Sequence, residues 1–264
     1  MNLNEINFSF GGLHCLRDFG AIYVEKGGHV IAPAIERDEY EIGGMAGSIL
    51  LGEGVPGTAR FDGSLYFLDD PPSQAAVQAR LRRMSAWLTN GRQRLIFDYE
   101  PERYYIASVS EALKWTYAGY LEGGLDIAFN AQPYAYALRE STASKATSGT
   151  GVQLLLTLDT GVPAPLGVSI QNTAASPITG AEVTAGCRQV RFAGLSLPQG
   201  DTLQITMEPP IGASFASGGN ALPYAERFDL LEAVKGTQTI DVGLTYGSGA
   251  RGARVTARAR GRWL

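Results

Sequence analysis

Closely spaced carboxylates are the residues of this chain that could perform acid–base chemistry. Asp98, Glu100 and Glu102 lie within five residues, and Asp69 is followed by Asp70. Two carboxylates that flank a glycosidic bond are the machinery of a glycoside hydrolase. However, the first cluster surrounds a tyrosine and a proline, a composition typical of a β-turn. The second precedes a predicted helix, where acidic side chains favour the positive end of the helix dipole. We therefore rank a hydrolase last among the functions considered.

The histidines and cysteines are not spaced as metal ligands. His14 and Cys15 are adjacent, so they point to opposite faces of an extended chain, and neither His14 nor His29 has a histidine or cysteine two to four residues away. Cys15 and Cys187 are too few for a disulfide framework or a zinc site. We expect no metal site, and folding in a reducing compartment.

Motifs for phosphate binding and for nucleophilic catalysis do not occur. The sequence contains no GxSxG, no GxxxxGK[ST] and no GxGxxG after a predicted strand. The glycine clusters at 43–47 and 217–219 have no helical pattern behind them, so they are predicted to be turns. The sequence therefore predicts a protein without a cofactor and without enzymatic activity.

Four arginines near the end of the sequence form its unusual charge feature. Arg254, Arg258, Arg260 and Arg262 share one parity, so an extended strand would carry guanidinium groups along one face. We expect this stripe to contact an acidic protein partner or a neighbouring subunit. The alternative is a solvated strand face partly paired with the chain's own carboxylates. A formal net charge of -4 disfavours binding to nucleic acid.

Composition favours turns and strands over helices. The chain has 264 residues, with 33 Gly, 13 Pro and only 18% charged residues. This length favours one large β domain or two smaller domains. There is no apolar run of about 18 residues, so no membrane-spanning helix is expected. The first residues lack a basic stretch followed by an apolar block, so no signal peptide is expected.

One segment has helical periodicity. Apolar residues at i, i+4, i+7 and i+11 predict an amphipathic helix within residues 71–90, with Asp70 or Ser73 as its cap. These apolar residues are Val77, Leu81, Met84 and Leu88. A single helix among strands must bury its apolar stripe, so we expect it to pack across a sheet.

The remaining segments read as short strands and turns. Alternation over residues 58–67 predicts a half-buried strand, with a tight turn or bulge at Asp62–Gly63. Residues 40–48, with three glycines within five residues, are predicted to be a loop. Residues 140–151 are small and polar and are predicted to be a linker or long exposed loop. Further strands are predicted at 8–10, 21–24, 94–97, 104–109, 124–129, 154–158, 166–170, 182–184, 190–192, 203–207, 228–230 and 239–246.

These elements predict a mainly β protein with two domains. Residues 1–138 would form a β-sandwich or barrel-like domain with one α-helix, and residues 139–264 a β-sandwich. In the last of the predicted strands, Ile240, Val242, Leu244 and Tyr246 share one face.

The order of several short motifs resembles the distal tail protein (Dit) family of long-tailed, non-contractile phages and related prophages. In the first half these motifs are Phe8-Ser-Phe-Gly-Gly, the glycine loop after Tyr40-Glu-Ile, the helix ending in Trp87-Leu88, Leu95-Ile-Phe-Asp, Pro101-Glu-Arg-Tyr-Tyr and Phe129-Asn-Ala-Gln-Pro-Tyr. In the second half they are Val168-Ser-Ile-Gln-Asn-Thr, Leu197-Pro-Gln-Gly-Asp-Thr-Leu-Gln-Ile and Arg260-Gly-Arg-Trp-Leu. The likeness covers nearly the whole chain. One departure is Met45-Ala46, where the family often carries an Arg-Asp pair.

The resemblance implies a structural virion protein at the tail tip, assembled in the host cytoplasm. Subunits of the family form a hexameric hub ring that stacks on the tail tube protein and on the tail-associated hub protein. The N-terminal domain would build the ring, and the C-terminal domain would be galectin-like and offer attachment to receptor-binding proteins. The alternative is a carbohydrate-binding module of a host-adhesion device, with Asn220, Tyr224 and Arg227 as the candidate glycan contacts.

Overall fold

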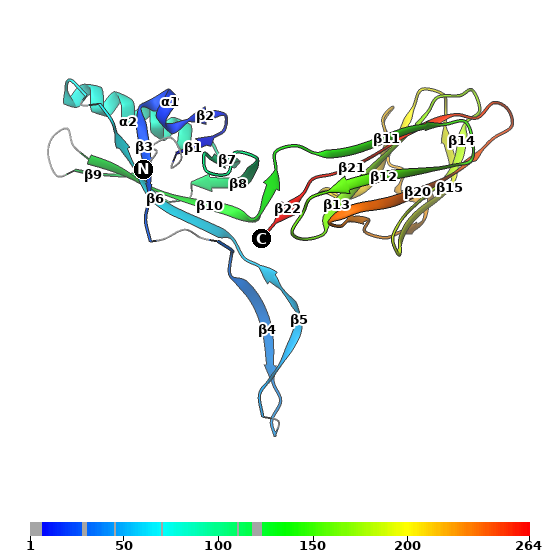
Figure 1. Ribbon diagram of the computed structural model, residues 1–264, viewed down its shortest axis with the longest axis horizontal. Coiled ribbons are helices and arrows are strands. Elements are labelled where there is room, and N and C mark those ends of the chain that lie inside the picture. Colours follow the sequence, from blue (N-terminus) through cyan, green and yellow to red (C-terminus); the bar gives the residue numbers. More distant parts are fainter. Residues whose placement is uncertain (1–6, 28–30, 45, 70, 110, 118–122) are drawn as a thin grey trace. The chain divides into compact units, whose positions relative to one another are not determined.

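The chain is mainly β and divides into two compact units in a computed structural model, shown in Figure 1. The structure describes residues 7–27, 31–44, 46–69, 71–109, 111–117 and 123–264. Unit 1 comprises residues 1–138 together with Leu264, and unit 2 comprises residues 139–263. Each unit buries its own cluster of apolar side chains, so each is described separately.

Unit 1 is built on one curled antiparallel sheet. Its strands run in the order β2-β1-β7-β8-β10-β6-β3, and β9 also pairs with β10. The strands β4 and β5 form a separate ribbon. The elements of unit 1 are β1 (Phe8–Phe10), β2 (Leu13–His14), α1 (Cys15–Phe19), β3 (Ala21–Glu25), β4 (Ile35–Glu41), β5 (Ser48–Pro56), β6 (Ala59–Phe67), α2 (Gln74–Leu88), β7 (Gln93–Phe97), β8 (Arg103–Val109), β9 (Lys114–Tyr117) and β10 (Gly123–Ala137).

The predicted helix is α2, and it packs its apolar stripe into the core of unit 1. The hydroxyl of Ser73 accepts a hydrogen bond from the backbone N–H of Ala76 at 3.2 Å, which caps the helix start as predicted. Val77, Met84 and Leu88 are buried, and so is Trp87, which the predicted stripe did not include. The Trp87 indole N–H donates to the Phe10 carbonyl at 2.7 Å, so this side chain joins the helix to β1.

A second helix, α1, was not predicted. It spans five residues, and the Nδ1 atom of His14 accepts hydrogen bonds from the backbone N–H groups of Leu16 and Arg17, both at 3.1 Å. Gly20 ends it with φ of 61°, a left-handed conformation that glycine adopts without strain. Phe19 then stacks on Trp87 with ring centroids 4.3 Å apart, so this short helix contributes to the core.

The predicted interruption at Asp62–Gly63 is wrong. β6 runs unbroken from Ala59 to Phe67 and pairs with β10 on one side and β3 on the other. Gly63 is needed because the Tyr23 ring lies over it: a Cβ atom at this position would lie 2.2 Å from a ring carbon. The glycine therefore accommodates a neighbouring aromatic ring without breaking the strand.

Unit 2 is a β-sandwich of two antiparallel sheets. One has the order β11-β21-β13-β16-β17, with β19 also pairing with β13, and the other has the order β12-β20-β14-β15-β18. Its elements are β11 (Ser141–Thr147), β12 (Gly151–Leu158), β13 (Ala164–Asn172), β14 (Ile178–Ala185), β15 (Arg188–Leu197), β16 (Thr202–Thr206), β17 (Gly212–Phe215), the 3-10 helix η2 (Leu222–Tyr224), β18 (Ala225–Phe228), β19 (Glu232–Ala233), β20 (Gly236–Tyr246), β21 (Ala253–Ala259) and β22 (Arg262–Trp263).

Alternating side chains fill the space between these two sheets. Ile240, Val242 and Leu244 on β20 are buried, which confirms the face predicted for this strand. The linker predicted for residues 140–151 is wrong, because β11 pairs with β21 along its whole length and Ala143 packs against the core. A strand at the edge of a sandwich can be this polar, since only one of its sides is covered. None of the helices in the described parts of the chain is long and apolar enough to span a membrane.

Candidate assembly surfaces

A two-stranded ribbon in unit 1, here called the arm (residues 35–56), exposes apolar side chains. Among the strands that the structure describes, β4 and β5 pair only with each other, so both outer edges of the arm are open. Tyr40, Leu51 and Val55 are 65%, 56% and 70% exposed. Figure 1 shows the arm as a long hairpin that extends beyond the main sheet of its unit. A lone hairpin of this kind has little stability in water, so the arm needs a surface that covers it.

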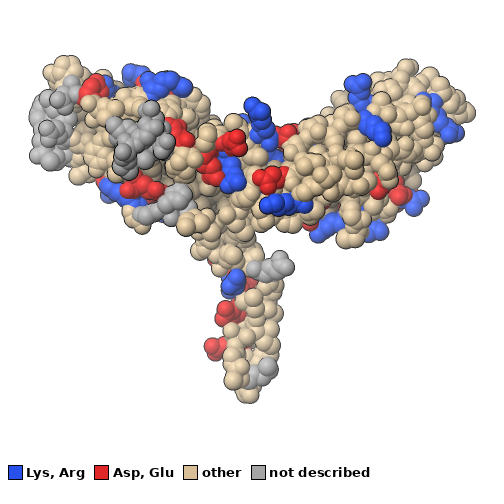
Figure 2. Space-filling view, viewed as in Figure 1, with Lys and Arg blue, Asp and Glu red and all other residues tan. Residues whose placement is uncertain are grey.

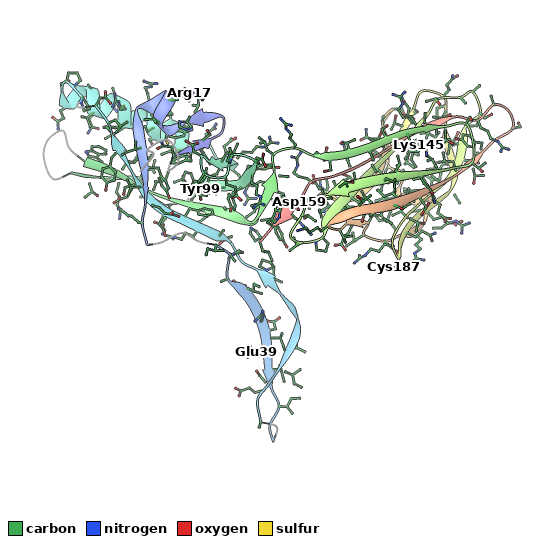
Figure 3. All side chains as sticks on the ribbon, in the orientation of Figure 1. Arg17, Glu39, Tyr99, Lys145, Asp159 and Cys187 are labelled. Carbon is green, nitrogen blue, oxygen red and sulfur yellow. The ribbon has the colours of Figure 1, made fainter. Side chains whose placement is uncertain are left out.

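The two faces of the arm differ in chemistry. Residues paired across the two strands point to the same side. By this register the apolar face carries Asp38, Tyr40, Ile49 and Leu51, and the acidic face carries Glu39, Glu41, Ser48 and Leu50. The Ser48 hydroxyl donates to the Glu39 carboxylate at 2.9 Å, and Figure 3 shows Glu39 projecting from the ribbon. The arm therefore combines an apolar face with a negatively charged one.

The predicted stripe of four arginines is reduced to two by the end of β21. Arg254 and Arg258 lie on β21 and are exposed, with Thr256 between them. The strand ends at Ala259, so Arg260 lies beyond it. Arg262 also lies outside it, and its Nε donates to the Pro163 carbonyl at 2.6 Å. The prediction of a continuous stripe is wrong because the chain leaves the sheet before the last two arginines.

Arg254 and Arg258 stand on a polar sheet face of unit 2. The row that crosses this face at Thr256 is made of Ser144, Thr256, Ser169, Gln204 and Ser214. Arg258 lies across Gly167, whose Cβ position would be 3.2 Å from its Nε. Within the described residues neither arginine forms an ion pair, so the alternative of pairing with the chain's own carboxylates does not hold for these two. This face is available to an acidic partner.

The architecture of both units recurs in a solved phage structure. No family model matches the chain, and no curated protein matches it. Among solved structures, it is similar to a protein described as "Crystal Structure of SPP1 Dit (gp 19.1) Protein, a Paradigm of Hub Adsorption Apparatus in Gram-positive Infecting Phages". The TM-score is 0.70 at 14% identity, over 98% of this chain and 99% of that one. The chain has the Dit fold. This confirms, at the level of the fold, the resemblance found in the sequence.

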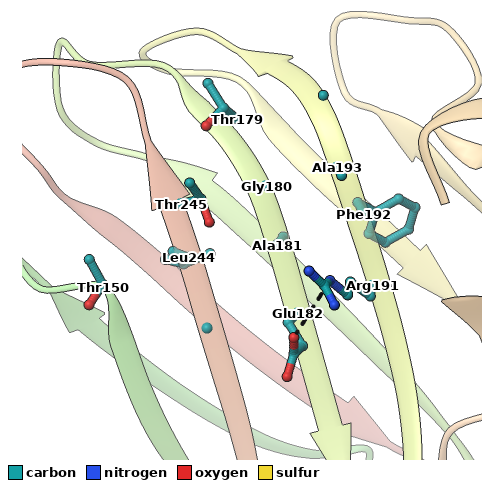
Figure 4. A pocket seen from close by; sticks show the side chains of 12 residues that line it. Thr150, Thr179, Gly180, Ala181, Glu182, Arg191, Phe192, Ala193, Leu244 and Thr245 are labelled. Atoms are coloured by element: carbon teal, nitrogen blue, oxygen red, sulfur yellow. Dashed lines mark ion pairs between the residues drawn. The ribbon is translucent and has the colours of Figure 1, made fainter. Parts of the chain in front are cut away.

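A trough crosses the sheet of unit 2 that contains β14, β15 and β20 (Figure 4). Its volume is about 500 Å³, and Gly180, Gly194 and Gly243 leave its floor without side chains. Arg191 and Glu182 line it with Nε and Oε2 3.9 Å apart. Sugar sites usually offer an exposed aromatic ring for stacking. The lining aromatic residue, Phe192, is only 2% exposed, so the trough does not favour the carbohydrate-binding alternative.

The three residues predicted to contact a glycan each contact another residue of the chain. The Asn220 side-chain oxygen accepts a hydrogen bond from the backbone N–H of Leu222 at 2.9 Å. Tyr224 is 42% exposed, and its ring meets Phe215 edge-on. Arg227 pairs with Asp229 at 2.7 Å. The prediction that these residues bind a glycan therefore gains no support from their contacts.

The carboxylate cluster that could have served a hydrolase lies in a turn and holds the fold together. Asp98 accepts from His14 Nε2 at 3.0 Å. Because Nδ1 of this histidine already accepts backbone N–H groups, Nε2 carries the proton and donates it. Glu100 pairs with Arg103 at 2.5 Å, so two members of the cluster have structural partners. His29 lies outside the described residues. Those residues hold no group of His, Cys, Asp and Glu side chains arranged to bind a metal ion.

The interpretation of Asp69 as a helix-start charge is wrong. The helix α2 begins only at Gln74, and the Asp69 carboxylate instead accepts two hydrogen bonds from the Arg80 guanidinium at 2.7 and 2.8 Å. This partner holds the pKa of Asp69 below its ordinary value. Asp70 lies outside the described residues.

The two cysteines differ in environment. Cys15 is buried, and burial raises the pKa of its thiol to about 11. A thiol with so high a pKa is a poor nucleophile at neutral pH, so Cys15 is a packing residue. Cys187 is exposed.

Sequence reasoning missed the arm, although its signal was present. Residues 35–41 and 48–56 flank the predicted glycine loop, and in the second segment Ile49, Leu51 and Val55 share one parity, as on one face of a strand. Their many charged residues and glycines hid this pattern. A glycine-rich turn between two such segments is a typical hairpin signal, and the turn is the tip of the arm.

Proposed function

We propose that this protein is a structural subunit of a phage tail, without enzymatic activity. In this proposal it forms a hexameric hub ring at the distal end of a long non-contractile tail. The ring joins the tail tube protein to the tail-associated hub protein and the receptor-binding apparatus. The protein then resides at the tail tip of the virion. The fold shared with a phage protein described as a paradigm of a hub adsorption apparatus supports this role.

The arm is the observation that carries the proposal. It presents two strand edges and an apolar face that the described residues of its own unit leave open. Open edges and exposed apolar patches of this kind are usually covered by another chain. If the arm of each copy contacts a different surface on the next copy, the contact is heterologous, and heterologous contacts that close produce rings. Six copies per ring follow from the family resemblance alone.

Arg254 and Arg258 supply a second surface for this role. They are exposed on a polar sheet face in unit 2, away from the arm in the sequence. We assign this face to an acidic partner in the tail-tip apparatus. Arg260 and Arg262 are not part of it, since they lie beyond the strand.

Ring assembly of the purified full chain tests the proposal. Size-exclusion chromatography with light scattering and negative-stain microscopy should show closed rings. The variant Tyr40→Ser/Ile49→Ser/Leu51→Ser removes the apolar face of the arm and should give folded monomers. Wild-type protein that stays monomeric at every concentration and shows no rings would refute the proposed function.

A further inference from the structure

The acidic face of the arm has a chemical counterpart elsewhere in unit 1. Residues 35–56 hold five acidic residues and one basic residue. Residues 71–97, which include α2, hold five arginines and no acidic residue. Figure 2 shows red side chains along the arm and blue side chains over the helical part of the unit. One chain thus carries two exposed surfaces of opposite charge.

Two arginines on the exposed side of α2 are available for a partner. Arg82 forms no hydrogen bond or ion pair within the described residues, and it is exposed. Arg83 is also exposed, and its guanidinium lies 5.7 Å from the ring centroid of Phe19. Arg80 differs, because Asp69 already holds it in a two-bond ion pair. The exposed neighbours Ala79 and Ala86 are small, so a flat ribbon could approach the helix closely.

The acidic face of the arm matches this pair. Glu39 and Glu41 are two residues apart on β4, so their Cα atoms are about 7 Å apart on the same side of the strand. Glu41 forms no hydrogen bond or ion pair within the described residues, and Glu39 is held only by the Ser48 hydroxyl. Arginine side chains are long enough to spread over such a spacing, and their planar guanidinium groups pair well with carboxylates.

We propose that the acidic face of the arm of one copy binds α2 of the next copy, with Glu39 and Glu41 facing Arg82 and Arg83. This inference rests on the proposed ring, and it adds the surface that receives the arm. A second copy of the chain is the fitting occupant, because a heterologous ring contact requires two different and complementary surfaces on every subunit. The charge pairs fix which part of the neighbour the arm meets. The apolar face lies on the opposite side of the ribbon, so a different surface of the assembly buries it.

A charge-swap experiment on the full chain tests this contact. Arg82→Glu/Arg83→Glu and Glu39→Lys/Glu41→Lys should each raise the concentration at which half of the protein is assembled by about tenfold or more. Combining all four substitutions should bring this concentration back to within about threefold of wild type, because the charges again have opposite signs. Lys145→Glu/Arg251→Glu makes the same charge change in unit 2 and should leave assembly unchanged. Melting temperatures of all variants verify folding.

The outcomes separate this inference from the proposed function. Rings formed equally well by wild type and by both single-surface variants would overturn the contact and leave the ring role intact. Loss of assembly in both variants without recovery in the four-residue variant would also overturn it, because the two surfaces would then meet different partners. Wild-type protein that forms no rings refutes the ring itself.

Discussion

The sandwich of unit 2 and the arm of unit 1 are both built from strands with alternating side chains, but the sandwich buries its apolar side chains and the arm exposes them. On β20, Ile240, Val242 and Leu244 are covered by a second sheet. On the arm, Tyr40 and Leu51 remain more than half exposed, because none of the described residues of the unit forms a second layer over them. A pleated strand provides an apolar face, and only a second layer can bury it. Unit 2 contains that layer, and we propose that the arm receives it from another copy.

The largest loss of stability is expected from a substitution in the core of unit 1. This core is formed without the apolar face of the arm. Trp87→Ala removes a buried ring that stacks on Phe19 and donates to the Phe10 carbonyl. The free energy of unfolding of unit 1 should fall by about 3–5 kcal/mol. Guanidinium unfolding followed by circular dichroism measures this change. A loss below about 1 kcal/mol would mean that this core does not depend on α2.

A smaller effect is expected from a buried polar side chain in unit 2. Asn172 is fully buried, and its amide donates to the carbonyls of Ser176 and Leu197 at 2.8 and 2.9 Å. Asn172→Ala removes both of these hydrogen bonds from a buried site and should cost about 2 kcal/mol. Thermal unfolding of this variant measures the loss. Gln171→Ala, an exposed neighbour on β13, is the matched control and should be close to wild type. Equal stability of the two variants would contradict the role assigned to Asn172.

A pH-dependent effect is expected at Asp126 in unit 1. Lys26 and Ser64 donate to its carboxylate and hold its pKa below the ordinary value of 3.8. Because the folded pKa is lower than the unfolded one, the stabilisation is present above the unfolded pKa and is lost as the pH falls through the folded pKa. The carboxylate is partly exposed, so Asp126→Asn should cost less than about 1 kcal/mol at pH 7. Unfolding of wild type and variant from pH 7 to pH 2 should show the difference shrinking; a difference that grows in acid would contradict this account.

The smallest effect is expected from an exposed apolar residue that lies outside the arm. Leu155 on β12 is 67% exposed, as much as Tyr40 on the arm, but it stands alone on an otherwise polar sheet face. Single exposed apolar residues are common on protein surfaces and need no partner. Leu155→Ser should therefore change stability by less than about 0.5 kcal/mol and should not alter assembly. Light scattering of this variant measures assembly, and a loss of rings would show that exposure alone does not distinguish the arm.

The sequence allowed the fold class to be predicted because periodicity reports burial. The helix at 74–88 and the strand at 236–246 bury the faces that their spacing indicated. Periodicity could not show what covers a strand. It therefore took β11, a polar edge strand, for a linker, and it did not reveal the two strands that flank the predicted glycine loop. It also extended the arginine stripe past Ala259, where the strand ends. Beyond that point Arg262 bonds to Thr160 and Pro163, and a periodic pattern cannot show such distant contacts.

The candidate site depends on exposure, which a single sequence does not report. Tyr40 and Ile49 have the composition of core residues, and only the structure shows that their unit leaves them exposed. The opposite holds for Asn220 and Arg227. The sequence suggested that they bind a ligand, but in the structure both have partners within the chain.

The most direct test of the account is the assembly state of two variants measured side by side. Wild type, Tyr40→Ser/Ile49→Ser/Leu51→Ser and Leu155→Ser are compared by light scattering and negative-stain microscopy at matched concentration. The account predicts rings for wild type and Leu155→Ser, and folded monomers for the arm variant with an unchanged melting temperature of unit 1. Rings formed by the arm variant as readily as by wild type would contradict it.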